Sequence, residues 1–135
     1  MNNLNVKNLL SALSSLKIAW VEYQKDCRND FVKDAVIHRF ENAYALAIKY
    51  IQRYLELTYA IPGQIDHLTF NELIRLANEK GILQNDLSQW AIYRQRRNIT
   101  SHTYNVQKAE LVLEIIDEFI EETQFLAEKI QCSAE

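Results

Sequence analysis

The residues of this chain best suited to chemistry lie in one short stretch, residues 94–105, which reads Arg-Gln-Arg-Arg-Asn-Ile-Thr-Ser-His-Thr-Tyr-Asn. Arg97 carries a permanent positive charge, and His102 is of the residue type that exchanges protons near neutral pH. Such a pair suits cleavage of RNA without a metal ion, because the imidazole can move a proton to or from the attacking 2′-hydroxyl or the leaving oxygen. The guanidinium can stabilise the charge that develops on the phosphate. We therefore predict Arg97 and His102 as catalytic residues.

The spacing of this pair places a condition on the local structure. Arg97 and His102 are separated by about 140° around an ideal α-helix, so they converge only if the helix loosens near His102 or if both reach one groove from its edges. Ser101 lies four residues after Arg97 and Asn98 lies four residues before His102, so we assign supporting roles to Asn98 and Ser101. Spacing alone leaves open that Arg97 and His102 only cap a helix end or bind a neighbouring carboxylate.

The other histidines and the cysteines give no sign of a metal site. His38 and His67 stand singly, without carboxylate or thiol partners at ligand spacing, and are interpreted as surface or partly buried structural residues. Cys27 and Cys132 are far apart and indicate reduced thiols in a cytoplasmic protein rather than a disulfide framework. We predict no metal and no cofactor.

Composition indicates that helices must position these residues. The chain has only two glycines and one proline, lacks runs of strand-favouring Val, Ile and Thr, and is rich in helix-forming residues. Apolar residues recur at intervals of three and four, the period of an amphipathic helix. The predicted helices are 4–27, 30–58, 70–80, 87–100 and one long segment from 106 to the end of the chain.

Residues that begin or end helices separate these segments. A loop is predicted over residues 59–68, a capping box opens the third helix, and a glycine in the left-handed conformation follows it. Side-chain caps are predicted at the starts of the last two helices. The residues concerned are Pro62 and Gly63 in the loop, Thr69 and Glu72 in the capping box, Gly81 after the helix, and Asp86 and Asn105 as caps.

The predicted fold is all-α, an antiparallel up-and-down four-helix bundle with an additional short helix, formed by residues 1–135 as a single domain. No segment has the roughly 20 consecutive apolar residues of a membrane span, and the N-terminus lacks a signal-peptide core. The formal net charge of −3 argues against a surface that attracts polyanions as a whole. Any contact with RNA must therefore come from a local patch, and we expect a soluble protein.

An acidic stripe runs along the last predicted helix, opposite its apolar face. Such a stripe is usually a solvated surface, although a basic partner protein is a second interpretation. Its members are Glu110, Glu114, Asp117, Glu118 and Glu121.

Three segments together resemble a known family. Residues 31–41, the turn Gly81-Ile82-Leu83 and residues 97–105 look like the nucleotidyltransferase substrate-binding family of HEPN proteins. The similarity runs from about residue 33 into the last helix. Its most specific part is an arginine followed after four residues by histidine, with a tyrosine two residues further on, here Arg97, His102 and Tyr104.

The resemblance implies a homodimer encoded beside a minimal nucleotidyltransferase, in a module that works in related pairs as a toxin and its antitoxin. In such pairs the HEPN member is a ribonuclease whose Arg and His correspond to Arg97 and His102. The tyrosine, here Tyr104, receives nucleotidyl groups such as AMP that silence the enzyme. Two alternatives stay open: packing or a hydrogen bond can hold Tyr104 at the turn, and the chain can be a non-catalytic adaptor that presents a substrate to the transferase.

The chain is not expected to be the transferase itself. It has no Gly-Ser turn followed by an Asp-x-Asp pair to hold two metal ions, and both of its glycines are assigned to turns.

Overall fold

The structure, a computed structural model, describes residues 4–59 and 63–133 and contains six α-helices and two short 3-10 helices in that part of the chain. The described residues include no strand, and the predicted all-helical class is confirmed. The α-helices are α1 Lys7–Lys25, α2 Asp30–Thr58, α3 Phe70–Glu79, α4 Leu87–Asn98, α5 Val106–Glu114 and α6 Ile116–Ser133, and the 3-10 helices are η1 Ile65–His67 and η2 Thr100–His102.

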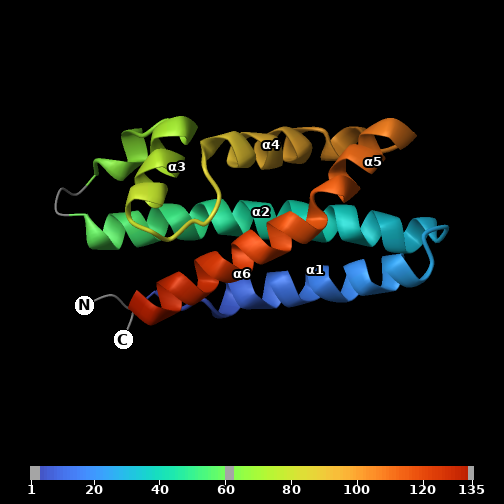
Figure 1. Cartoon of the computed structure of the whole chain (residues 1–135), viewed down its shortest axis with the longest axis horizontal. Coiled ribbons are helices and arrows are strands. Elements are labelled where there is room, and N and C mark those ends of the chain that lie inside the picture. The colour runs from blue at the N-terminus through green and yellow to red at the C-terminus, as the bar shows by residue number, and fades with distance from the viewer. Residues whose placement is uncertain (1–3, 60–62, 134–135) are drawn as a thin grey trace.

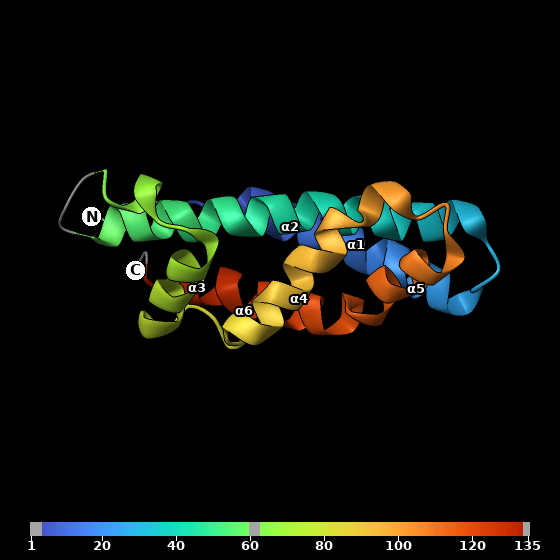
Figure 2. The same cartoon turned by 90° about the horizontal axis from the view of Figure 1, so that it is seen from above.

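The three longest helices run along the length of the molecule. α1 and α2 form an antiparallel pair joined by a short turn, and α6 packs beside α1 (Figure 1). α3, α4 and α5 follow one another along a second side of α2, and α4 crosses α2 obliquely (Figure 2). This arrangement places the C-terminal end of α4, which carries the candidate catalytic stretch, against the N-terminal half of α2.

The predicted helix starts are confirmed in their hydrogen bonds. The Thr69 hydroxyl accepts a hydrogen bond from the Glu72 backbone N–H, and the Glu72 carboxylate accepts one from the Thr69 backbone N–H. These two bonds complete the capping box and lower the pKa of Glu72. Asp86 and Asn105 cap α4 and α5 through side-chain oxygens. Gly81 has a φ of 76°, the left-handed conformation predicted for the end of α3. Of the predicted Pro62-Gly63 turn, Pro62 lies outside the described residues.

The single long C-terminal helix predicted from residue 106 is wrong, because the helix breaks at Ile115. The Ile115 N–H donates to the Val112 carbonyl at 3.3 Å, a 3-10 type bond, and its ψ is 3°. Ile115 and Ile116, at the break, are both buried. The break lets α5 and α6 take different directions (Figure 1).

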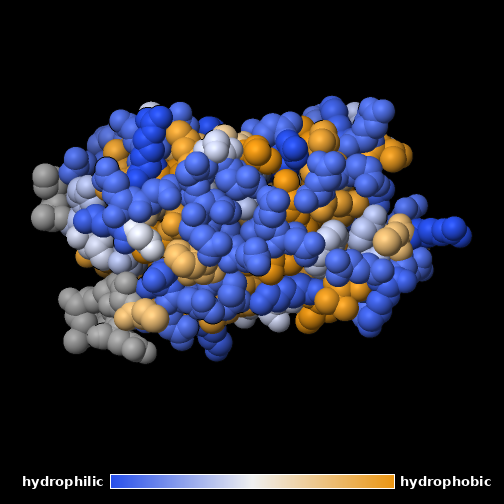
Figure 3. Space-filling model, in the orientation of Figure 1, coloured by the Kyte–Doolittle hydropathy of each residue, from blue (hydrophilic) through white to orange (hydrophobic). Residues whose placement is uncertain are grey.

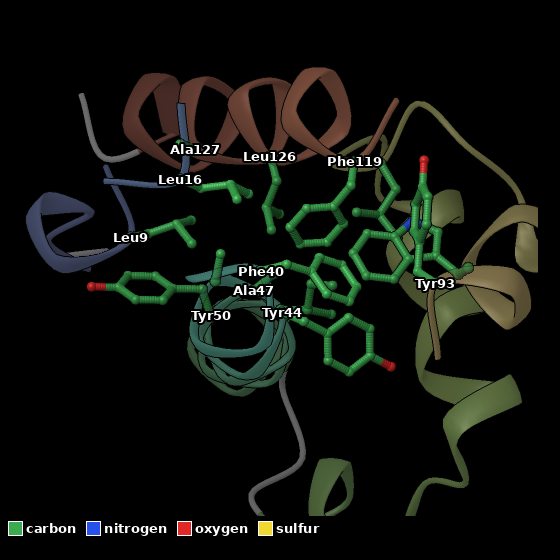
Figure 4. Close-up of a cluster of buried hydrophobic side chains, with 14 of the residues drawn as sticks. Leu9, Leu16, Phe40, Tyr44, Ala47, Tyr50, Tyr93, Phe119, Leu126 and Ala127 are labelled. Atoms are coloured by element: carbon green, nitrogen blue, oxygen red, sulfur yellow. The ribbon is translucent and has the colours of Figure 1, made fainter. Parts of the chain in front are cut away.

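An aromatic cluster holds α4 against α2 and α6. The ring of Phe119 lies 5.0 Å from that of Phe40 and 5.4 Å from that of Tyr93, both edge-on. Trp90 contacts the same group, with its ring centroid 5.2 Å from that of Tyr93. Figure 4 shows the rings of Phe40, Tyr93 and Phe119 beside aliphatic side chains from α1 and α6. Edge-to-face aromatic pairs contribute stabilisation beyond that of the area the rings bury. The cluster therefore fixes the position of α4.

A fully buried carboxylate ties the connection between α3 and α4 to α6. Glu122 Oε1 accepts a hydrogen bond from the Gln84 backbone N–H at 2.9 Å, and Oε2 accepts from the Asn85 backbone N–H at 2.8 Å. Oε2 also accepts from the indole N–H of Trp90 at 2.8 Å. Burial raises the pKa of Glu122 by more than these hydrogen bonds lower it. The side chain therefore pairs with three N–H donors of α4 and of the segment before it, which would otherwise be buried without a hydrogen-bond partner.

Replacing Glu122 with Gln should lower the free energy of unfolding by about 1–3 kcal/mol, since an amide NH₂ group then faces at least one buried N–H donor. Urea unfolding monitored by circular dichroism measures the change. Glu121, the exposed neighbour on α6, provides the matched control, and Glu121→Gln should change the stability by less than about 0.5 kcal/mol.

The effect of Glu122 should also depend on pH. A raised folded-state pKa means that the folded protein binds the proton more tightly than the unfolded chain, whose value is near 4.5. The stabilisation by Glu122 is then fully present below about pH 4.5 and is lost as the pH rises through the folded-state pKa. The stability difference between wild type and Glu122→Gln should narrow as the pH is raised, and a constant or widening difference would contradict this assignment.

The surface seen in Figure 3 is mostly hydrophilic, with hydrophobic residues in small groups between polar ones. Among the described helices, none combines the length and the apolar character required to cross a membrane. Cys27 and Cys132 are both exposed free thiols.

Candidate functional site

The helix that carries Arg97 ends one residue later. α4 stops at Asn98, Ile99 leaves the helical conformation with a ψ of 3°, and residues 100–102 form the 3-10 turn η2. The condition set by the spacing of Arg97 and His102 is therefore met, because the α-helix does loosen before His102. The helical register that related Ser101 to Arg97 and His102 to Asn98 ends at the same point, and Asn98 and Ser101 are both exposed.

Glu41 on α2 organises this junction. Its Oε2 accepts a hydrogen bond of 2.7 Å from the Thr100 hydroxyl and lies 3.7 Å from Nη1 of Arg97. The Thr100 hydroxyl also lies 2.8 Å from the Arg97 carbonyl oxygen, so it links the end of α4 to the same carboxylate. Thr100 is buried, whereas the Arg97 side chain remains 40% exposed. The guanidinium is thus oriented from one side and open to solvent on the other.

His38 and Asn42 extend the network around Glu41. The Nδ1 atom of His38 lies 3.9 Å from Glu41 Oε1, and the Asn42 amide nitrogen lies 3.4 Å from His38 Nε2. His38 is an exposed residue, as predicted, but it does have a carboxylate neighbour in Glu41. His38 and Glu41 are three residues apart on one helix, a spacing that brings side chains together.

His102, the last residue of η2, and Tyr104 lie beside each other. Their ring centroids are 6.1 Å apart and the rings meet edge-on at 77°. Tyr104 is 85% exposed, and His102 is also exposed. The exposure of Tyr104 does not favour the alternative in which this side chain is packed at the turn, and a bulky group could reach its hydroxyl.

The site therefore consists of two small groups joined by η2. Arg97 belongs to the first, with Glu41 and Thr100, and His102 belongs to the second, with Tyr104. Within the described residues no hydrogen bond or ring contact joins Arg97 directly to His102.

An open hollow adjoins Arg97. Tyr44, Ala45 and Ile48 of α2 line it, together with Phe70, Arg94, Arg97 and Asn98. The Arg94 guanidinium lies over the Phe70 ring, 4.6 Å from its centroid. Burial raises the pKa of Tyr44 to about 12, although Arg94 and Arg97 both act to lower it. The Tyr44 hydroxyl is therefore a neutral hydrogen-bond donor at physiological pH.

Metal ligands are not grouped in the part of the chain that the structure describes. In residues 4–59 and 63–133, no cluster of three or more His, Cys, Asp or Glu side chains could hold a metal ion. Metal-independent chemistry at Arg97 and His102 stays a prediction.

Comparison with known proteins shows the family to which this chain belongs. Residues 4–132 match the family described as nucleotidyltransferase substrate binding protein like. A Haemophilus influenzae protein named probable ribonuclease HepT is 35% identical over 112 residues, which are 83% of this chain and 76% of that protein. A solved Haemophilus influenzae structure, described as revealing the fold of a substrate binding domain of a nucleotidyltransferase, has a TM-score of 0.87 at 32% identity and covers 94% of this chain and 99% of that one.

A crystal structure of a protein from Thermus thermophilus is also similar. Its TM-score is 0.74 at 25% identity, and the match covers 90% of this chain and 98% of that one. The family match spans nearly all of the chain, and the relatives are matched over most of their own lengths. This protein therefore belongs to the nucleotidyltransferase substrate-binding protein family.

Proposed function

We propose that this protein is a cytoplasmic, metal-independent endoribonuclease that acts as a homodimer and is the partner of a minimal nucleotidyltransferase. In this scheme Arg97 and His102 carry the cleavage, Asn98 and Ser101 support substrate binding, and nucleotidylation of Tyr104 silences the enzyme in a toxin-antitoxin module. The relative named as a ribonuclease and the family description support the two halves of the proposal.

The observation that carries the proposal is the exposed junction between α4 and η2. It presents a guanidinium held from behind by Glu41 and, a few residues on, an accessible imidazole. Permanent positive charge and a proton carrier are the two functions that transesterification of RNA needs from an enzyme. The protein as a whole is acidic, so this local arrangement, with Arg94 and Arg96 beside it, supplies the positive field for an RNA strand.

In the proposed reaction the RNA 2′-hydroxyl attacks the adjacent phosphorus and the bond to the 5′-oxygen breaks. The proton of the 2′-hydroxyl leaves and the departing 5′-oxygen gains one, and His102 carries one of these transfers. Arg97 stabilises the additional negative charge on the phosphate oxygens in the transition state. The products are a 2′,3′-cyclic phosphate and a 5′-hydroxyl.

The homodimer is expected to form near the end of the bundle where α1 turns into α2. Phe31 at the start of α2 and Val106 at the start of α5 are 88% and 66% exposed, and both helix starts lie at the end where α1 turns into α2 (Figures 1 and 2). An isologous interface would duplicate whatever lies near its axis and so could bring two Arg97/His102 sites together. Static light scattering at micromolar concentration should give twice the mass of 15.9 kDa. A monomer would contradict this part of the proposal.

Glu41 should matter for activity without taking part in proton transfer. Glu41→Gln keeps an acceptor for the Thr100 hydroxyl but removes the charge that orients Arg97, so cleavage should fall by about tenfold with little change in stability. Glu56, exposed near the other end of α2, provides a control, and Glu56→Gln should retain full activity. If Glu41→Gln cleaves RNA as fast as wild type, the carboxylate does not position Arg97.

The adaptor function is the second candidate, favoured by the solved relative described as a nucleotidyltransferase substrate binding domain. The two candidates differ in one assay. The purified protein, incubated with total RNA in the presence of EDTA, should produce discrete cleavage fragments if it is a ribonuclease. Intact RNA together with stable binding to the cognate transferase would favour the adaptor.

A further inference from the structure

The hollow beside Arg97 has the features of a built binding site. It measures about 360 Å³, near the lower end of the roughly 300–1,000 Å³ typical of small-ligand sites. Its lining combines apolar side chains, Ala45, Ile48 and the Phe70 ring, with the guanidinium groups of Arg94 and Arg97. Apolar side chains beside planar cations suit a flat, polar-edged ligand better than a bare anion.

Tyr44 adds an independent sign that the hollow binds a ligand. The side chain is only 8% exposed and lines the hollow, and its hydroxyl points away from the buried cluster in Figure 4. Among the described residues nothing accepts or donates a hydrogen bond to that hydroxyl. Buried phenols usually have such a partner, and a molecule bound in the hollow can supply the acceptor.

We propose that this hollow binds the nucleobase of an RNA nucleotide next to the cleaved phosphate, an assignment that rests on the proposed ribonuclease function. The base lies on Ala45 and Ile48 beside the stacked Arg94 and Phe70, and one of its carbonyl oxygens accepts a hydrogen bond from Tyr44. Aromatic and guanidinium planes are the usual partners of unpaired RNA bases. The Tyr44 hydroxyl and the two guanidinium groups are all donors, so uracil, which has two carbonyl acceptors, should fit better than adenine, whose exocyclic group is an amine donor.

A titration of the full-length protein with uridine 5′-monophosphate, followed by NMR of its methyl groups, tests the proposal without requiring cleavage. The methyl resonances of Ala45 and Ile48 should shift saturably, and adenosine 5′-monophosphate should bind more weakly. Ribose 5-phosphate, which has the sugar and phosphate but no base, should leave these resonances in place. Equal shifts with ribose 5-phosphate would show an anion site instead, and no shift with any nucleotide would overturn the proposal.

Matched variants locate the contacts. Tyr44→Phe removes one oxygen and keeps the ring, and should weaken binding of uridine 5′-monophosphate by about threefold to tenfold. Tyr50→Phe is the control, because Tyr50 is equally buried on α2 but donates to the Asn5 carbonyl outside the hollow. Arg94→Lys keeps the charge and loses the plane, and should weaken binding about fivefold or more. Equal affinity of Tyr44→Phe and Tyr50→Phe would remove Tyr44 from the site.

Failure of the nucleobase site can be distinguished from failure of the proposed ribonuclease function. If uridine 5′-monophosphate binds as described but RNA is not cleaved, the nucleotide site stands and the catalytic assignment of Arg97 and His102 fails. If RNA is cleaved by wild type and by Tyr44→Phe at the same rate and no nucleotide shifts Ala45 or Ile48, the catalytic assignment stands and this proposal is wrong.

Discussion

Replacing His102 with Ala is expected to lower the rate of RNA cleavage by about 10²-fold or more, because general acid-base catalysis typically contributes 10²–10⁴-fold. The side chain is exposed on η2, so the variant should keep the thermal stability of wild type. A labelled RNA followed on denaturing gels gives the rate, and EDTA should leave the wild-type rate unchanged.

Two further variants sharpen this result. His67, an exposed histidine on η1, provides the matched control, and His67→Ala should cleave at the wild-type rate. Arg97→Ala should lose about 10²–10³-fold, the magnitude seen when a single donor to a developing oxyanion is removed. Equal cleavage by wild type and His102→Ala would show that the imidazole carries no proton, and the adaptor function would then be favoured.

Nucleotidylation of Tyr104 is expected to abolish cleavage without unfolding the protein. The added group carries a negatively charged phosphodiester beside His102 and near the Arg97 junction, where it can occupy the position of the RNA phosphate. Exposure favours this tyrosine, since Tyr104 is 85% exposed and every other described tyrosine is buried or half-buried. Incubation with the cognate transferase, ATP and Mg²⁺, followed by peptide mass spectrometry, should show one or more AMP units on the Tyr104 peptide.

Tyr104→Phe separates modification from simple occlusion. The variant should accept no AMP and should remain an active ribonuclease in the presence of the transferase and ATP. If the transferase inhibits cleavage while Tyr104 stays unmodified, control by covalent modification is wrong and the partner blocks the site by binding alone.

Local features of the fold could be predicted from the sequence because short-range chemistry determines them. The predicted second helix, 30–58, agrees with α2 at both ends, and Asn29 caps it through hydrogen bonds to the backbone N–H groups of Phe31 and Val32. The capping box at Thr69 and the left-handed Gly81 follow from residue types that suit those backbone positions.

The parts that could not be predicted depend on contacts between distant segments. Glu41 meets Thr100 across 59 residues of sequence, and no local pattern indicates that pairing. The break at Ile115 was hidden because the apolar period continues across it in α5 and α6. Glu122 directly follows the acidic stripe, yet its side chain is buried, since the three N–H donors that bind it come from α4 and from the segment before α4, both distant in sequence.

The measurement that tests the central assignment most directly is the chemistry of the cleaved ends. RNA cut by the wild-type protein in EDTA should end in a 2′,3′-cyclic phosphate and begin with a 5′-hydroxyl, and a strand with 2′-deoxyribose at the cleavage position should stay intact. These products would be absent with His102→Ala. Products with 5′-phosphate ends, or cleavage of the 2′-deoxy strand, would contradict an attack by the RNA's own hydroxyl at Arg97 and His102.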